Sequence, residues 1–284
     1  MPTTTSIQSP ARVLVFDSGV GGLSVLREIS QRTPDVELIF ACDNAAFPYG
    51  TLSEARLLER VVAVVGRFIE ETKPDIAVIA CNSASTLVLN ELRHQFDIPF
   101  VGVVPAIKPA AVASKSKVIG LLATPGTVER SYTDSLIAEF APDCTLVRVG
   151  SSELVTMAED KLRGTAPDMA TLEQIVAPLL AEESLDTLVL ACTHFPLLME
   201  ELTGLFSENV RLIDSGKAIA RRVETLITPA DQPLQTEAKL VQYETPEYEK
   251  QKHQALMTQD DPALSAMSKQ IAPFRLAPFE ILAL

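Results

Sequence analysis

Two cysteines occupy matching positions in this sequence. Cys81 follows the apolar run Ile76–Ala80, Cys192 follows the apolar run Leu188–Ala191, and small polar residues come directly after each thiol. A short apolar run followed by an amphipathic stretch predicts a buried strand, a sharp turn and the start of a helix. The unpaired N–H groups and the positive dipole end of that helix favour a thiolate. Two such cysteines on a repeated unit indicate two thiols that face one small substrate from opposite sides.

Two further groups could assist these thiols. Asp17 opens a glycine-rich turn, Asp17–Gly22, which lacks the spacing of the dinucleotide-binding and P-loop motifs. Asp17 could therefore cap the following helix, or it could orient and deprotonate a nearby thiol. His194 lies just beyond Cys192. A lone histidine is more often structural, but beside a thiol it can relay a proton near neutral pH.

The polar residues after the cysteines have two interpretations. Asn82, Ser83 and Thr193 could cap helices, or they could donate hydrogen bonds to a carboxylate at the same helix ends. Cys42 and Cys144 lack such a setting and are interpreted as packing residues. No C-x-x-C pair or zinc-type spacing of cysteine and histidine occurs, so no metal site is predicted.

The environment of the two cysteines is repeated on a larger scale. One apolar run ends at Asp17 and another at Thr124, and each is followed by a turn that contains glycine. The separation between Asp17 and Cys81 is close to that between Thr124 and Cys192. Matched strand ends at similar spacing predict a duplicated α/β unit whose halves are related by a pseudo-twofold axis.

Apolar runs and amphipathic stretches alternate along the chain. The predicted strands are 13–16, 38–41, 76–80, 100–103, 118–123, 145–149, 187–191 and 211–213, and the predicted helices include 55–72, 131–140, 169–182 and 217–227. This alternation predicts parallel sheets that are covered on both faces and bind ligands at the carboxyl ends of their strands.

The same pattern predicts two domains. Residues 11–97 plus 210–284 form the first α/β domain, which carries Asp17 and Cys81, and residues 98–209 form the second, which carries Thr124 and Cys192. A polar, proline-containing linker is expected at 228–237. The C-terminal segment, with a strand at 239–243 and a helix near 262–271, is expected to pack on the first domain.

Composition excludes several classes of protein. The chain has 284 residues and a formal net charge of −13, so it offers no basic surface for nucleic acid. It has no apolar run of membrane-spanning length, and its first residues do not resemble a signal peptide. We therefore expect a cytoplasmic protein with reduced thiols. Because the negative charge repels small anions, an anionic substrate must be held by local contacts.

Six motifs together resemble the glutamate racemases of the cofactor-independent aspartate/glutamate racemase family. They are Asp17-Ser-Gly-Val-Gly-Gly-Leu, Pro48-Tyr-Gly, Cys81-Asn-Ser-Ala-Ser, Ala123-Thr-Pro-Gly-Thr, Cys192-Thr-His-Phe-Pro-Leu and Leu212-Ile-Asp-Ser-Gly. The resemblance implies two pseudosymmetric parallel-sheet α/β domains with the active site between them. It also implies racemisation of glutamate without pyridoxal phosphate or metal, a homodimer, and a role in supplying D-glutamate for peptidoglycan, cell-wall biogenesis and cell shape.

The resemblance also implies roles for individual residues. Cys81 takes the Cα proton from D-glutamate with the help of Asp17, and Cys192 takes it from L-glutamate with the help of His194. Glu159 is the closest match to a family carboxylate near the second thiol. The implied substrate-binding residues are Asp17, Ser18, Pro48, Tyr49, Gly50, Asn82, Ser83, Thr124, Thr127, Thr193 and His194.

Three alternatives remain open at this stage. An aspartate racemase would share the two thiols but differ in the length of its pocket. A cysteine hydrolase would use Cys192 as nucleophile and His194 as base, which leaves Cys81 unexplained. A binding protein with two hinged lobes would use both cysteines only for packing, and serine substitutions at Cys81 and Cys192 would leave its function intact.

Overall fold

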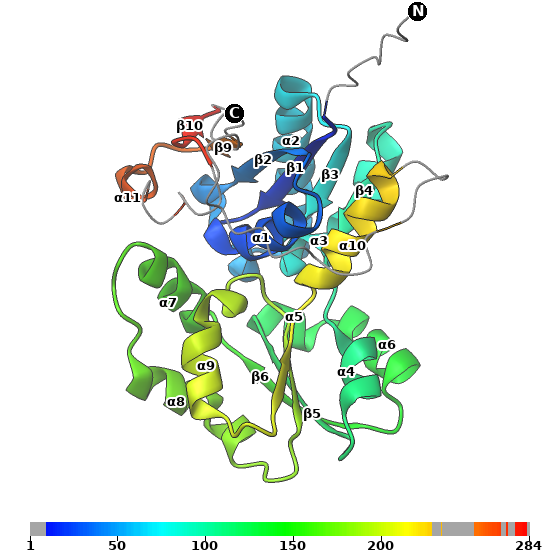
Figure 1. Cartoon of the computed structure of the whole chain (residues 1–284), viewed down its shortest axis with the longest axis vertical. Coiled ribbons are helices and arrows are strands. Elements are labelled where there is room, and N and C mark those ends of the chain that lie inside the picture. The colour runs from blue at the N-terminus through cyan, green and yellow to red at the C-terminus, as the bar shows by residue number, and fades with distance from the viewer. Residues whose placement is uncertain (1–9, 229–233, 235–252, 268–270, 272–275, 283–284) are drawn as a thin grey trace, which may run out of the picture.

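The strands of this chain form two separate parallel sheets. The computed structural model describes residues 10–228, 234, 253–267, 271 and 276–282. Within these residues the first sheet has the strand order β10-β9-β2-β1-β3-β4 and the second the order β6-β5-β7-β8 (Figure 1). Each sheet is flanked by helices, so the predicted architecture of two parallel-sheet α/β units is confirmed.

Side chains of the first sheet alternate between two apolar clusters. On β1, Val13 and Val15 pack with residues of α1 and α10, whereas Leu14 and Phe16 pack with residues of α2 and α3 on the other face. All four side chains are fully buried, which is why the strand reads as a continuous apolar run. The elements of this unit are β1 (Arg12–Asp17), β2 (Glu37–Cys42), β3 (Ile76–Ile79), β4 (Phe100–Gly102), β9 (Gln254–Met257), β10 (Glu280–Ile281), α1 (Leu23–Arg32), α2 (Glu54–Thr72), α3 (Asn82–Gln95), α10 (Gly216–Ile227) and α11 (Pro262–Ala266), with 3-10 turns η1 (Val20–Gly22), η2 (Asn44–Ala46) and η3 (Tyr49–Thr51).

The second sheet is built in the same way. Leu122 and Leu188 pack with residues of α7, α8 and α9, whereas Leu121 and Val189 pack on the opposite face against α4 and α6. The elements are β5 (Val118–Ala123), β6 (Thr145–Gly150), β7 (Thr187–Leu190), β8 (Arg211–Ile213), α4 (Ile107–Ala113), α5 (Pro125–Glu129), α6 (Ser131–Phe140), α7 (Glu153–Leu162), α8 (Met169–Leu180) and α9 (Met199–Leu205), with the 3-10 turn η4 (Phe195–Leu198).

Two short strands belong to the sheet opposite to the one predicted. The expected boundaries assign 100–102 to the second domain and 211–213 to the first, but β4 pairs with β3 and β8 pairs with β7. The chain therefore crosses between the units after each of these strands. A three-residue apolar run carries no information about which neighbour it pairs with, so only the assembled sheet decides. The two crossings contact each other where the Ser215 hydroxyl donates to the Val104 carbonyl at 2.6 Å.

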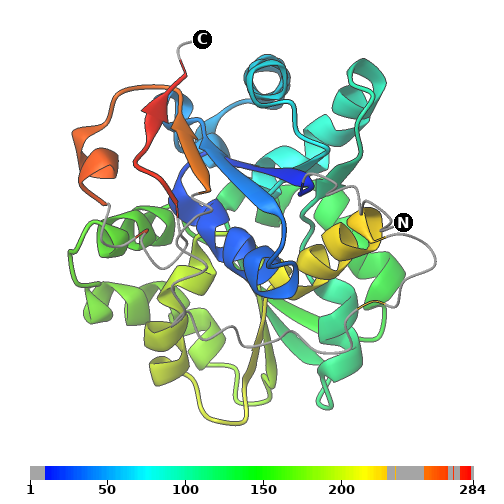
Figure 2. The ribbon, with the colours of Figure 1, turned by 45° about the horizontal axis from the view of Figure 1, so that its top comes forward.

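The C-terminal segment returns to the first sheet, as expected. Strand β9 pairs in parallel with β2, and β10 pairs in parallel with β9. Figure 2 shows these strands and α11 along one side of the first unit. The predicted strand at 239–243, like nearly all of the expected linker, lies outside the described residues. Among the helices that are described, none combines the length and the apolar character needed to cross a membrane.

Candidate active site

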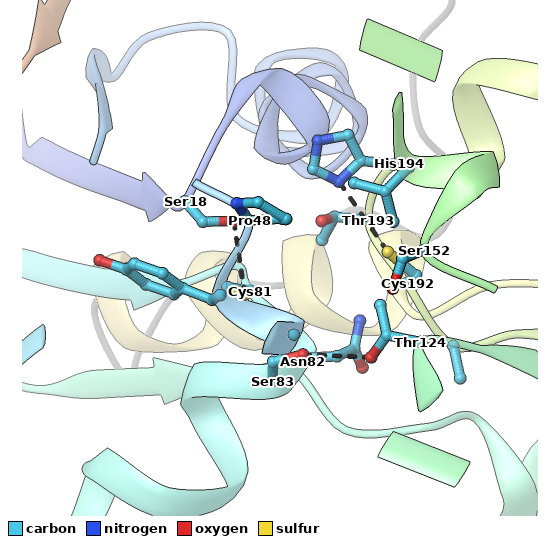
Figure 3. Close-up of a pocket in the computed structure, with 14 residues that line it drawn as sticks. Ser18, Pro48, Cys81, Asn82, Ser83, Thr124, Ser152, Cys192, Thr193 and His194 are labelled. Carbon is cyan, nitrogen blue, oxygen red and sulfur yellow. Dashed lines mark hydrogen bonds between the residues drawn. The ribbon is translucent and has the colours of Figure 1, made fainter. Parts of the chain in front are cut away.

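The carboxyl ends of both sheets contribute to one cavity. Asp17 is the last residue of β1, Cys81 follows β3, and Thr124 and Cys192 follow β5 and β7. Figure 3 shows Cys81 and Cys192 on opposite sides of this cavity, which encloses about 390 Å3 including its opening to solvent. Its lining includes the predicted residues Ser18, Pro48, Tyr49, Gly50, Cys81, Asn82, Ser83, Thr124, Cys192, Thr193 and His194.

Three predicted site residues lie behind the lining. Asp17, Thr127 and Glu159 are at most 2% exposed and do not line the cavity. Each of them instead touches a side chain of the lining or its close neighbour. Any effect that they have on a bound molecule is therefore transmitted through another residue.

Cys81 lies in an apolar and negatively charged environment. Its Sγ is 4.0 Å from the Ser18 hydroxyl. Burial, followed by the nearby charge of Asp17, raises the pKa of Cys81 well above its usual value, although the Ala84 N–H at the start of α3 opposes this. The expectation that the helix start favours a thiolate is therefore wrong for Cys81, because burial and the carboxylate outweigh the helix end. Cys81 is held as a thiol.

Asp17 connects the two units. Its carboxylate accepts hydrogen bonds from the Ser18 N–H at 2.6 Å and from the Thr193 hydroxyl at 2.7 Å. Burial raises the pKa of Asp17 above its usual value, and the charge of His194 together with the Thr193 hydrogen bond opposes that shift. Asp17 therefore contacts Ser18, which lies next to the Cys81 thiol, and it also contacts Thr193 on the loop that carries Cys192.

Cys192 has an acid–base partner of its own. The Nδ1 atom of His194 is 3.9 Å from the Cys192 Sγ, and its Nε2 atom is 2.9 Å from Glu159 Oε1. Burial disfavours the charged imidazole, but the hydrogen bonds with Cys192 and Glu159 outweigh burial and raise the pKa of His194 well above its usual value. His194 therefore places an acid–base group beside the Cys192 thiol.

Two contacts compete for the Nε2 atom of His194. Its Nε2 atom is 3.2 Å from the Gly21 amide nitrogen and 2.9 Å from the Glu159 carboxylate. One ring nitrogen cannot accept from the amide while it donates to the carboxylate. The carboxylate contact is shorter and charge-assisted. Nε2 therefore carries a proton, which it donates in a hydrogen bond to Glu159 Oε1. The Val20 N–H also donates to Glu159 Oε1, at 2.8 Å.

The glycine-rich turn packs closely against the second unit. A Cβ atom on Gly21 would overlap the His194 ring, and a Cβ atom on Gly19 would overlap the Glu159 carboxylate. Glycine at these positions therefore allows the first unit to approach the acid–base group of the second.

Three hydroxyl groups form a row at another wall of the cavity. The Ser83 Oγ is 3.3 Å from the Thr124 Oγ1, which is 3.0 Å from the Thr127 Oγ1. This row brings a residue of the first unit into contact with residues of the second. The Oδ1 atom of Asn82 is buried there and has no hydrogen-bond partner among the described residues. A buried acceptor without a partner is costly, so a ligand or a water molecule that donates to it would be stabilised there.

Tyr49 is anchored by its hydroxyl group. Its hydroxyl donates to Asp43 Oδ2 at 2.6 Å, and Arg60 pairs with the same carboxylate. The phenol is therefore engaged within the first unit. Tyr49 also lines the cavity, together with Gly50.

Sequence analysis missed three residues of the cavity lining: Ser152, Val155 and Ala191. Ser152 and Val155 follow strand β6, whose carboxyl end lies at the same edge as that of β5. The predicted strand 145–149 could have indicated this position, since ligand-binding residues follow the carboxyl ends of parallel strands. Among the described residues, no cluster of His, Cys, Asp and Glu has the arrangement of a metal site.

Comparison with known proteins identifies the family. The model of the Asp/Glu/Hydantoin racemase family matches residues 14–223. The chain belongs to this family. Its relatives include the glutamate racemase of Serratia proteamaculans (strain 568), which is 52% identical over 238 residues, or 84% of this chain and 83% of the relative. The glutamate racemase of Shewanella sp. (strain MR-7) is 54% identical over 228 residues, or 80% and 84% of the two chains.

Solved structures of this racemase family have the same fold. The crystal structure of Escherichia coli glutamate racemase, in complex with L-glutamate and the activator UDP-MurNAc-ala, aligns with a TM-score of 0.85 at 46% identity. The alignment covers 96% of this chain and 98% of that one. Glutamate racemase isoform RacE1 from Bacillus anthracis aligns with a TM-score of 0.78 at 26% identity, over 98% and 99% of the chains.

Proposed function

We propose that this chain is a glutamate racemase that uses Cys81 and Cys192 as its two acid–base groups. The observation that carries the proposal is that the two thiols lie on opposite sides of one cavity, each beside a different assisting group. Racemisation removes a proton from one face of Cα and returns a proton to the other face. Two fixed groups accomplish this without rotation of the substrate.

The site has two halves, Cys81 with Asp17 and Cys192 with His194, and the surroundings of the two thiols differ. His194, whose pKa is raised, lies beside Cys192, whereas burial and Asp17 raise the pKa of Cys81 well above its usual value. In the L-to-D direction, the Cys192 thiolate takes the Cα proton and the electron pair of the broken C–H bond stays on the substrate. The Cys81 thiol then gives its proton to the opposite face, which leaves a Cys192 thiol and a Cys81 thiolate. The D-to-L reaction is the reverse.

Neutral donors are proposed to hold the substrate. The Ser83 and Thr124 hydroxyls and the Thr193 loop can donate to carboxylates, and Asn82 Oδ1 can accept from the α-ammonium group. Donors aimed at the α-carboxylate stabilise the negative charge that develops when the Cα proton leaves. The proposal includes no cofactor, because protein groups supply both proton transfers.

The relatives support this substrate assignment. Glutamate racemases from Serratia and Shewanella share more than half of the aligned residues, and the related Escherichia coli structure contains L-glutamate. Supply of D-glutamate for peptidoglycan, cell-wall biogenesis and cell shape, a cytoplasmic location, a homodimer and the division into two domains are parts of the same proposal. The biological role and the homodimer rest on the family resemblance of the motifs, the location rests on composition, and the domain division rests on the pattern of strands and helices.

The decisive experiment follows the Cα–H signal of L-glutamate by proton NMR in D2O, with reduced protein and no added cofactor. Loss of the signal together with the appearance of D-glutamate is the expected result. A parallel sample with L-aspartate tests the sister activity. Exchange of aspartate alone would replace the proposed substrate, and exchange of neither amino acid would refute the two-thiol mechanism for both.

One observation favours a second candidate function. Cys192, His194 and Glu159 are connected in the order of a nucleophile, a base and an orienting carboxylate. A cysteine hydrolase uses such a set. It would form a covalent adduct at Cys192 and would not need Cys81, so an acyl adduct detected by mass spectrometry and unchanged turnover in Cys81→Ser would support it.

A further inference from the structure

Arg130 links the two units beside the cavity. It lies between α5 and α6 of the second unit, and its Nη1 atom donates to the Ser83 carbonyl at 2.7 Å and to the Thr86 hydroxyl at 2.8 Å. Both acceptors belong to α3 of the first unit. Its Nε atom is 3.4 Å from Glu54, at the start of α2. All of these polar contacts therefore cross from one unit to the other.

Arg130 is held in place through both its backbone and its side chain. Its backbone carbonyl accepts a hydrogen bond from the Thr133 N–H at 2.9 Å, and Arg130 is the N-cap residue of α6. Its side chain is only 12% exposed, whereas its partner Glu54 is 66% exposed. An exposed ion pair contributes little. The two hydrogen bonds to α3, which are charge-assisted and largely shielded from water, are the stronger part of the link.

The link lies directly behind the wall formed by hydroxyl groups. Arg130 holds the carbonyl of Ser83, and the hydroxyl of the same residue meets Thr124 of the second unit at 3.3 Å. Separation of the units at this wall would break both contacts together. Two other polar links between the units, from Ser24 to the Thr193 carbonyl and from Thr193 to Asp17, lie on the loop of the second thiol.

We propose that Arg130 is a positioning residue that holds Ser83 against Thr124 and thereby sets the fraction of free protein in the closed, substrate-binding arrangement. The proposal rests on the racemase function proposed above. Arg130 does not line the cavity, so it acts through Ser83. When only a fraction of the protein is competent to bind, the apparent affinity falls by that fraction. Chemistry within the closed complex is unaffected.

The test compares Arg130→Ala and Arg130→Lys with a matched control, Arg148→Ala. Arg148 also belongs to the second unit and pairs with an aspartate, but its partner Asp134 lies in the same unit at 2.7 Å. Loss of a hydrogen bond to a charged group corresponds to about a tenfold to hundredfold change, so KM for glutamate should rise by that factor in Arg130→Ala. The kcat should change much less, Arg130→Lys should lie between, and Arg148→Ala should match wild type.

Two further measurements separate positioning from general loss of structure. Guanidinium ion added below denaturing concentration should lower the KM of Arg130→Ala and leave wild type unchanged. Hydrogen exchange of the free protein should show faster exchange in the first turn of α3 in Arg130→Ala, and saturating D-glutamate should restore the protection. Arg148→Ala should show neither effect.

Several results would overturn the proposal. These are an unchanged KM in Arg130→Ala, a loss confined to kcat, or an equal loss in Arg148→Ala. Failure of the racemase function itself is recognised separately, because wild-type protein would then not exchange the glutamate Cα–H. In that case unchanged exchange of α3 amides in Arg130→Ala would still refute the link, since this readout does not depend on turnover.

Discussion

The contact between Glu159 and His194 offers the sharpest test of the second half-site. Glu159→Gln keeps the shape of the side chain and an oxygen that can accept from Val20, but it removes the charge that faces the imidazole. Both side chains of the pair are 3% exposed, so solvent does not screen their interaction. A hydrogen bond to a charged group contributes about 1.5–3 kcal/mol, which corresponds to a roughly tenfold to hundredfold loss of rate.

The loss should be confined to one thiol. In a Cys81→Ser background only Cys192 remains, so L-glutamate should exchange its Cα–H in D2O without inversion. Glu159→Gln should slow this exchange by the factor given above. In a Cys192→Ser background, exchange of D-glutamate at Cys81 should be unaffected. Equal slowing in both backgrounds, or none in either, would refute the assignment of Glu159 to His194.

The same substitution should change the pH dependence of stability. Because the folded-state pKa of His194 is raised, the stability that it contributes is fully present below its unfolded pKa, about 6.5, and is lost as pH rises through the folded value. Denaturant unfolding should therefore show the largest difference between wild type and Glu159→Gln below that pH. Histidine NMR titration should show a lower pKa for His194 in the variant. The exposed Glu153→Gln, on the same helix, is the matched control.

Three more outcomes are expected. Cys81→Ser and Cys192→Ser should each abolish racemisation, measured by circular dichroism of glutamate, while each retains Cα–H exchange of one enantiomer. Asp17→Asn should lose activity but gain stability in urea at neutral pH, because the raised pKa of Asp17 means that burial of its charge costs stability as pH rises above its unfolded pKa, about 3.9. Equal stability at neutral pH would contradict this. Arg32→Met should lower stability by about 1.5–3 kcal/mol in calorimetry, because it removes the charge-assisted contact of 2.5 Å with Glu224, whose side chain is 4% exposed.

Local sequence patterns predicted most of the secondary structure and the placement of Cys81 and Cys192 after strands. The strand at 118–123 and the helix at 131–140 have the predicted bounds. Fully buried parallel strands form continuous apolar runs, and the helices between them show apolar residues at a helical period. Both patterns are visible within a short stretch of sequence. The placement of Asp17, Cys81 and Cys192 at strand ends followed from the same signal. The family motifs supplied the expected partners of these residues.

The assembled structure decided what depends on contacts between distant segments. Glu159 meets His194 across 35 positions of sequence, and Arg130 meets Ser83 across 47. The sheets that receive β4 and β8 were likewise decided by assembly, because a strand of three residues carries too short a pattern to indicate its neighbour.

Protonation of the site was also decided by tertiary structure. The sequence places Cys81 at a helix start, which favours a thiolate, yet burial together with Asp17 keeps it a thiol. Sequence by itself determined which residues reach the strand ends, since strand and turn propensities act over a few neighbours. Tertiary structure alone determined which of those residues are desolvated and which charges face them, because burial and Coulomb interactions depend on every segment packed around the site.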